Sequence, residues 1–153
     1  MAVRFAARHE MDHHLGSLAA SGAVVLDDRV VVAPSGIWVI DAKALLGQVQ
    51  KRDVGSLFSV DWRLYVGRRD CTSLLGAVSR RARVVRAALE DETCCVPVLP
   101  VLCLCDAEWS WFVKPFQMNG VVVSSPKATA KLVGQPGPWT SDDIHRIADA
   151  LTG

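Results

Sequence analysis

The sequence lacks any hydrophobic run of the roughly 18 to 20 residues that a membrane-spanning helix needs. Its longest apolar stretch, from Val96 to Cys105, is interrupted by Pro97 and Pro100 and has the length of a buried strand. The first ten residues also lack the apolar segment of a secretory signal peptide. We therefore expect no membrane insertion and a cytoplasmic location.

Cysteine is present, but without a pattern that would define a fold. The five cysteines are an odd number and show neither the spacing of a disulfide scaffold nor a Cys-x-x-Cys pair. Cys103 and Cys105 lie in the longest apolar stretch, and Cys94 and Cys95 precede it. We interpret these residues as small buried thiols in a reducing compartment.

An excess of charge of one sign is also missing, because the formal net charge is +1. The global charge therefore identifies no partner. Locally, the segment from Trp62 to Arg86 contains a single acid, Asp70, and seven arginines: Arg63, Arg68, Arg69, Arg80, Arg81, Arg83 and Arg86. Such a patch suits nucleic-acid phosphates. The alternative is a solvated helix face.

The chain has 153 residues, half of them hydrophobic, which is enough for one domain over residues 1–153 with one core. Periodicity predicts helices over 8–21, 72–90, 126–133 and 141–151 and strands over 23–26, 29–33, 37–42, 48–53, 57–66, 96–105 and 120–124. The strand over 37–42 is apolar on both faces and should be central. This order predicts an α/β fold with a mixed central sheet and helices on both faces.

The stretch HEMDHHLG, residues 9–16, contains the zinc-protease motif HExxH in His9, Glu10 and His13. On a helix the two histidines would face the same way. A catalytic zinc needs a third ligand, yet the metzincin position holds Ala19, and the next histidine after residue 14 is His145. Whether an aspartate or glutamate provides the third ligand is left open. We interpret the histidines as solvent-facing or capping residues.

The segment DDRVVVAPSGIWVIDAK, residues 27–43, concentrates candidate chemistry. In an extended strand Asp41 and Lys43 point to the same face. Asp28 begins the strand that we expect to pair antiparallel across the turn at residues 34–36, which brings a second carboxylate to the same place. Carboxylates suit Mg²⁺, and a lysine beside them can orient water. The alternative is an aspartate and a lysine that merely end a strand in water.

Within this segment, VVVAPSGIWVIDAK resembles the core of the NERD (nuclease-related) domain of the PD-(D/E)xK restriction-endonuclease-like superfamily. Looser similarity in YVGRRDCTSLLGAV, VLPVLCLCDAEW and VVVSSPKATAKLV extends over most of the chain. The resemblance implies a restriction-endonuclease-like fold. It also implies metal-dependent hydrolysis of phosphodiester bonds, with nucleic acid, in particular DNA, as the partner.

The resemblance assigns roles to residues at matching positions. Asp28 and Asp41 would hold Mg²⁺ or Mn²⁺ together with the carbonyl group of Ala42. Lys43 would position the attacking water, and Glu10 of the first helix would contribute a further carboxylate. The arginines that would contact the phosphodiester backbone are Arg68, Arg69, Arg80, Arg81 and Arg83.

The chain departs from the family pattern at three places. Asp27 is an alternative to Asp28, because the segment before the first acid is shortened. Arg8 is an alternative match for the position of Glu10, and Arg81 stands where the family often has a glutamine. The alternative function is therefore a catalytically degenerate relative that binds nucleic acid. DNA versus RNA, endo- versus exonucleolytic action, sequence preference and oligomeric state stay open.

Overall fold

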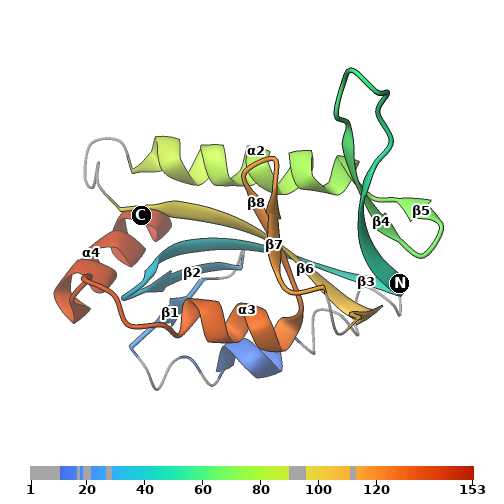
Figure 1. The fold of residues 1–153 in the computed structure, drawn as a ribbon. Helices are drawn as coiled ribbons and strands as arrows, with labels where there is room; N and C mark the ends of the chain where they lie inside the picture. The colour runs from blue at the N-terminus through green and yellow to red at the C-terminus, as the bar shows by residue number, and fades with distance from the viewer. Residues whose placement is uncertain (1–10, 17, 19–21, 27–28, 90–95, 111–112) are drawn as a thin grey trace.

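The structure of the chain is a computed structural model, which describes residues 11–16, 18, 22–26, 29–89, 96–110 and 113–153 (Figure 1). Residues 11–16 are helical. The elements that follow are β1 (Val24–Val25), β2 (Val30–Ala33), β3 (Gly36–Asp53), β4 (Trp62–Val66), β5 (Arg69–Asp70), α2 (Ser73–Ala88), β6 (Val98–Glu108), β7 (Phe116–Met118), β8 (Val121–Ser124), α3 (Pro126–Val133) and α4 (Ser141–Thr152).

The main sheet has the strand order β1-β2-β3-β6-β8-β7. Strands β3, β6 and β8 run parallel to one another, and the pairs β1–β2, β2–β3 and β7–β8 are antiparallel. The parallel step from β3 to β6 includes the long helix α2, as such a connection requires. The first half of β3 thus lies between two strands, and Val39 and Ile40 are fully buried. The predicted central strand is confirmed.

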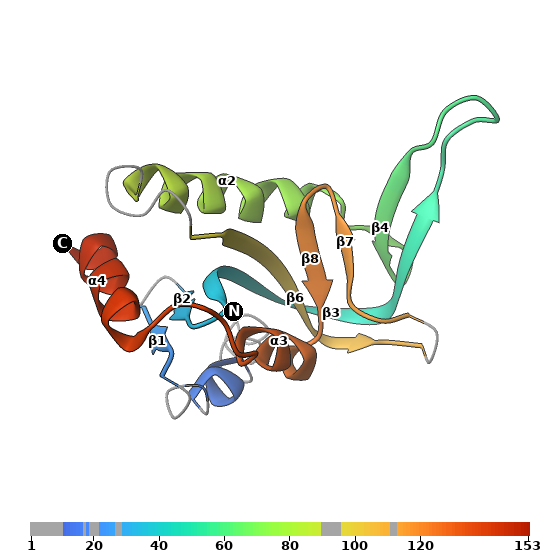
Figure 2. The same cartoon turned by 60° about the vertical axis from the view of Figure 1, so that its left-hand side comes forward.

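Helices cover both faces of this sheet, as Figures 1 and 2 show. On one face, Ile37 and Val39 of β3 belong to the same buried cluster as Leu75 and Val78 of α2. On the other face, alternate strand residues such as Ile40 pack with the helical residues 11–16 and with α3. Helix α4 packs on the α2 face, against β1 and β2. The predicted α/β fold with a mixed sheet is confirmed.

The helices follow the predicted pattern closely. Helix α3 begins at Pro126 after the N-cap Ser125, whose side chain accepts a hydrogen bond from the Ala128 N–H. Helix α4 begins after Thr140, which forms a capping box with Asp143. In α2 the apolar stripe is buried at Leu75, Val78 and Ala82, and the C-cap residue Leu89 continues it. No helix in the described ranges is long and apolar enough to cross a membrane.

The predicted strands over 48–53 and 57–66 agree with the structure only in part. Strand β3 continues from Gly36 to Asp53, and the next strand begins only at Trp62. The physical reason is a β-bulge between Ala44 and Gly47, where the register against β6 shifts. Gly47 has a φ of +129°, which lets β3 bend at this residue and continue beyond it. The short strand β7 was not predicted.

Beyond the bulge, β3 pairs with β4 to form a projecting hairpin, residues 49–66, which we call the β-arm. Val49 pairs with Val66 at its base, and Asp53 pairs with Trp62 near its tip. The β-arm rises away from the main sheet on the side that carries α2 (Figure 2). One continuous strand therefore connects the centre of the sheet to this projection.

Candidate functional site

Asp41 and Lys43 lie together on the α2 face of β3. Their side chains follow the alternation set by Ile37 and Val39, which contact the α2 cluster. Lys43 Nζ is 3.8 Å from Asp41 Oδ1, and the side chains are 32% and 19% exposed, respectively. The predicted shared face is therefore confirmed for this pair, and both groups are partly accessible to solvent.

Their partial exposure follows from their position along the strand. The described ladder between β2 and β3 ends where Val30 pairs with Val39, two residues before Asp41. On the other side, Asp41 and Lys43 pair with Leu102 and Leu104 of the parallel strand β6. The pair thus lies beside a fully buried strand segment, which holds its backbone in place.

A third charged group comes from α2. Arg81 Nη1 donates a hydrogen bond to the carbonyl oxygen of Ile40 at 3.3 Å. The guanidinium is therefore held against the backbone one residue before Asp41. Sequence position alone placed Arg81 next to the buried Val78 stripe, and the structure brings it to the predicted site.

No hydrogen bond or ion pair joins the other predicted arginines to Asp41 in the described part of the chain. Arg68 and Arg69 lie at the turn between β4 and β5, and Arg80 and Arg83 are on α2; all four are exposed. Their exposure is that of solvated surface arginines, and their contact with nucleic acid stays a prediction.

Two predicted carboxylates, Asp28 and Glu10, lie outside the described residues, as does His9 of the zinc-protease motif. Among the described residues, Arg29 Nη2 forms an ion pair with Asp12 Oδ1 at 3.3 Å. This contact joins the start of β2 to the helical residues 11–16. The second carboxylate at Asp41 and the absence of a zinc role for His9 both stay predictions.

The described residues provide few ligands for a metal ion. Within these ranges no group of three or more histidine, cysteine, aspartate or glutamate side chains forms a metal cluster. Asp41 does supply the hard oxygen donor that Mg²⁺ takes, and Mg²⁺ is often held by only one or two carboxylates plus water and substrate phosphate. Ala42 could contribute only its carbonyl group, because its side chain has no donor atom. The predicted Mg²⁺ or Mn²⁺ site therefore stays a prediction.

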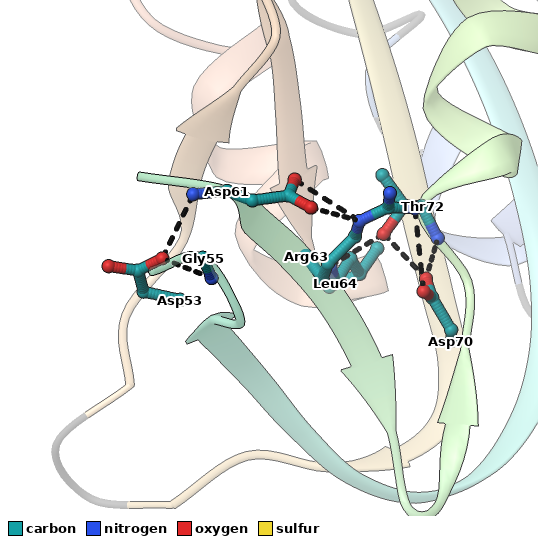
Figure 3. Close-up of polar contacts among 7 residues, drawn as sticks. All are labelled: Asp53, Gly55, Asp61, Arg63, Leu64, Asp70 and Thr72. Carbon is teal, nitrogen blue, oxygen red and sulfur yellow. Dashed lines mark hydrogen bonds and ion pairs between the residues drawn. The ribbon is translucent and has the colours of Figure 1, made fainter. Parts of the chain in front are cut away.

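A second polar cluster, which sequence reasoning missed, lies along the β-arm (Figure 3). Asp53 Oδ1 accepts hydrogen bonds from the N–H groups of Asp61 and Gly55, each at 2.9 Å. These bonds lower the pKa of Asp53. An aspartate two residues before a glycine is typical of a turn in which the aspartate side chain accepts a hydrogen bond from the backbone. This pattern in Asp53 and Gly55 was the sequence signal that could have predicted the turn.

At the base of the β-arm, Asp70 Oδ1 accepts hydrogen bonds from the hydroxyl and the N–H of Thr72, at 2.6 Å and 3.0 Å (Figure 3). These bonds lower the pKa of Asp70. Arg63 lies between Asp61 and Asp70 and forms ion pairs with both. Because each carboxylate here has donors from the protein itself, the cluster stabilises the hairpin.

Comparisons with known proteins identify no relative of this chain. No protein-family model, no curated protein and no solved structure matches the chain.

Proposed function

We propose that the chain is a metal-dependent nuclease-type domain of the PD-(D/E)xK kind, which hydrolyses phosphodiester bonds in DNA. The observation that carries this proposal is the pair Asp41 and Lys43, 3.8 Å apart on one face of β3. A mixed sheet with helices on both faces supports the restriction-endonuclease-like assignment. The resemblance of residues 30–43 to the NERD core supports it independently.

Each residue has a distinct task in this proposal. The Asp41 carboxylate holds Mg²⁺ or Mn²⁺, with the Ala42 carbonyl as a further donor. When bound, the ion polarises the phosphoryl group and lowers the pKa of the attacking water. The Lys43 ammonium donates hydrogen bonds to that water or to a phosphoryl oxygen and stabilises the charge that develops there. Asp28 and Glu10 are the proposed additional carboxylates.

One observation favours the second candidate, a degenerate relative that binds nucleic acid without cleaving it. Around Asp41 the described residues place two cations, Lys43 and Arg81, against one carboxylate. Such a balance favours an anion such as a phosphate over a divalent cation. A glutamine in place of Arg81 would shift the balance toward a metal.

The test combines cleavage and binding by the full chain. Supercoiled plasmid and single-stranded DNA are incubated with Mg²⁺, Mn²⁺ or EDTA, using the wild type, Asp41→Asn and Lys43→Ala. The matched control is Lys127→Ala, an exposed lysine on α3, which covers the opposite face. We expect metal-dependent cleavage that falls by about 10² or more in both site variants and is unchanged in the control.

The other outcomes are equally informative. Binding without cleavage in every metal would overturn the enzyme and support the degenerate relative. The absence of any binding to DNA or RNA would overturn both. Circular dichroism of each variant checks that lost activity is not lost folding.

A further inference from the structure

The tip of the β-arm holds two large apolar side chains in water. Leu57 and Phe58 are 98% and 97% exposed. They occupy the middle of a tight turn, in which Ser56 and Ser59 form a backbone bridge and their hydroxyl groups are 3.1 Å apart. Residues of this kind at a projecting tip indicate a binding surface more often than a structural need.

The turn that presents them is firmly built. The Asp53 carboxylate binds the N–H groups of Gly55 and Asp61, as Figure 3 shows. The Val54 N–H donates to the Asp61 carbonyl at 2.9 Å. A Cβ at Gly55 would come within 2.1 Å of the Ser59 carbonyl oxygen. The tip is therefore preorganised, which reduces the conformational entropy that a binding partner must offset.

Below the tip, cations lie over aromatic rings. Lys51 Nζ is 4.7 Å from the centre of the Trp62 ring, and the Arg52 guanidinium is 4.9 Å from that of Tyr65. Neither cation forms an ion pair with a carboxylate of the described ranges. Aromatic faces interleaved with basic groups are typical of surfaces that bind nucleic-acid strands.

The pairing of the two strands adds to this positive charge. Arg52 lies directly opposite Arg63 in the ladder, and like charges at such a position destabilise a hairpin. Arg63 is compensated by Asp61 and Asp70, whereas Arg52 lies over the Tyr65 ring and forms no ion pair with the described residues. A polyanion would complement this arrangement.

We propose that the β-arm is a nucleic-acid-binding element whose tip enters a groove. Leu57 and Phe58 wedge into a base step, while Lys51 and Arg52 contact the flanking phosphates. The inference deepens the proposed function and rests on it in one respect, namely that the partner is nucleic acid. It does not require the chain to cleave its partner.

Charge favours nucleic acid over a purely apolar partner. Near Leu57 and Phe58, Val54 and Val60 are also 49% and 66% exposed, and the cations Lys51 and Arg52 lie directly below them over aromatic rings. A base step accommodates one or two apolar side chains, and its flanking phosphates complement the cations.

The position of the β-arm relative to Asp41 and Lys43 suits one continuous duplex. Both lie on β3, and the β-arm rises on the α2 side, which is the face of the sheet that carries this pair (Figure 2). At about 3.3 Å per residue, Lys43 and Leu57 are at most roughly 46 Å apart. One turn of B-DNA is ~34 Å long. The tip would therefore bind within about one and a half helical turns of the proposed site.

The test uses the full chain, the double variant Leu57→Ser/Phe58→Ser and the control Val84→Ser, an exposed apolar residue on α2. The probe is a fluorescent 30-base-pair DNA duplex with 2-aminopurine scanned along its positions. We expect the double variant to bind at least tenfold more weakly in anisotropy titrations and to lose a 2-aminopurine fluorescence increase seen with the wild type. The control should match the wild type.

A second variant tests the charged part of the β-arm. Lys51→Ala/Arg52→Ala should reduce the slope of log affinity against log salt by about 2, because two phosphate contacts are lost. An unchanged slope would overturn the phosphate contacts. Since all four substituted side chains are at the surface, circular dichroism should be unaffected.

The remaining outcomes separate this inference from the proposed function. Equal DNA binding by the wild type and the tip variant would overturn the wedge and leave the nuclease-type proposal standing. A wild type that binds no nucleic acid would overturn both. Tip-dependent binding to phosphatidylserine vesicles, or a tip-dependent dimer in sedimentation, with no effect on DNA binding, would overturn the inference in favour of those partners.

Discussion

Arg81 Nη1 lies 3.3 Å from the carbonyl oxygen of Ile40, and this hydrogen bond joins α2 to β3 one residue before Asp41. The carbonyl belongs to a fully buried residue, and the donor is charged. A bond of this type contributes more to stability than a neutral one. Arg81 thus connects the packing of α2 to the position of the candidate site.

We expect Arg81→Met to lower the free energy of unfolding by about 1 to 3 kcal/mol, because it removes a charged donor from a buried carbonyl. The matched control is Arg83→Met, on the exposed side of α2, which should change stability by less than about 0.5 kcal/mol. Urea unfolding followed by circular dichroism measures both. Equal losses in the two variants would contradict a specific role for the Ile40 contact.

Gly47 should tolerate no side chain. A Cβ there would lie 2.7 Å from the Gly67 nitrogen and 2.8 Å from its Cα, and φ is +129°. Because both neighbouring atoms are backbone, relief requires the β-arm to shift. We expect Gly47→Ala to lower the free energy of unfolding by about 2 kcal/mol or more and to increase protease cleavage within residues 49–66.

The control for this prediction is Gly16→Ala, because Gly16 is helical and a Cβ there meets nothing within 4 Å. It should be neutral or stabilising by up to about 1 kcal/mol. A Gly47→Ala variant as stable as Gly16→Ala would show that the bend does not depend on glycine.

The capping box of α4 should give a pH-dependent contribution to stability. Hydrogen bonds from the Thr140 N–H and hydroxyl, followed by the charge of Arg146, lower the pKa of Asp143. A carboxylate with a lowered pKa stabilises the fold above its unfolded value of about 3.9. That contribution disappears as the pH falls through the lower folded value.

The melting temperature of Asp143→Ala should therefore lie below that of the wild type at pH 6, and the gap should close as the pH falls below about 4. Differential scanning calorimetry between pH 2 and pH 7 measures the gap, with the neighbouring Asp142→Ala as the comparison. A gap that widens in acid would contradict this sign.

Cys71 should react slowly while the chain is folded. Burial raises the pKa of its thiol, and the nearby Arg69 offsets this only in part. Since the thiolate is the reactive form, we expect alkylation by iodoacetamide at pH 8 to be at least tenfold slower than in urea. Mass spectrometry of the peptide that contains Cys71 measures this rate. Equal rates in the two conditions would contradict the buried position.

Local sequence signals predicted most of the regular structure. The apolar stripe through Val78 predicted α2, and the first-turn Pro126 predicted α3 with the bounds that the structure has. The shared face of Asp41 and Lys43 followed from strand alternation alone. These features depend on residues within one or two turns, or within one strand, of each other.

The course of β3 could not be predicted in this way. Residues 57–61 include several hydrophobic side chains, so the sequence favoured a strand that begins at residue 57, yet the side chains of Leu57 and Phe58 are in solvent. Where a strand ends depends on whether a neighbour supplies hydrogen bonds. For β3 that neighbour changes from β6 to β4 beyond the bulge at Gly47.

The sequence by itself determined the α/β composition, the buried central strand and the adjacency of Asp41 and Lys43, because these follow from hydrophobic periodicity and chain geometry. Only the tertiary structure decided that Arg81 reaches the Ile40 carbonyl and that β3 extends into a projecting β-arm. The first depends on how α2 packs across the sheet. The second depends on pairing between strands, which no local pattern specifies.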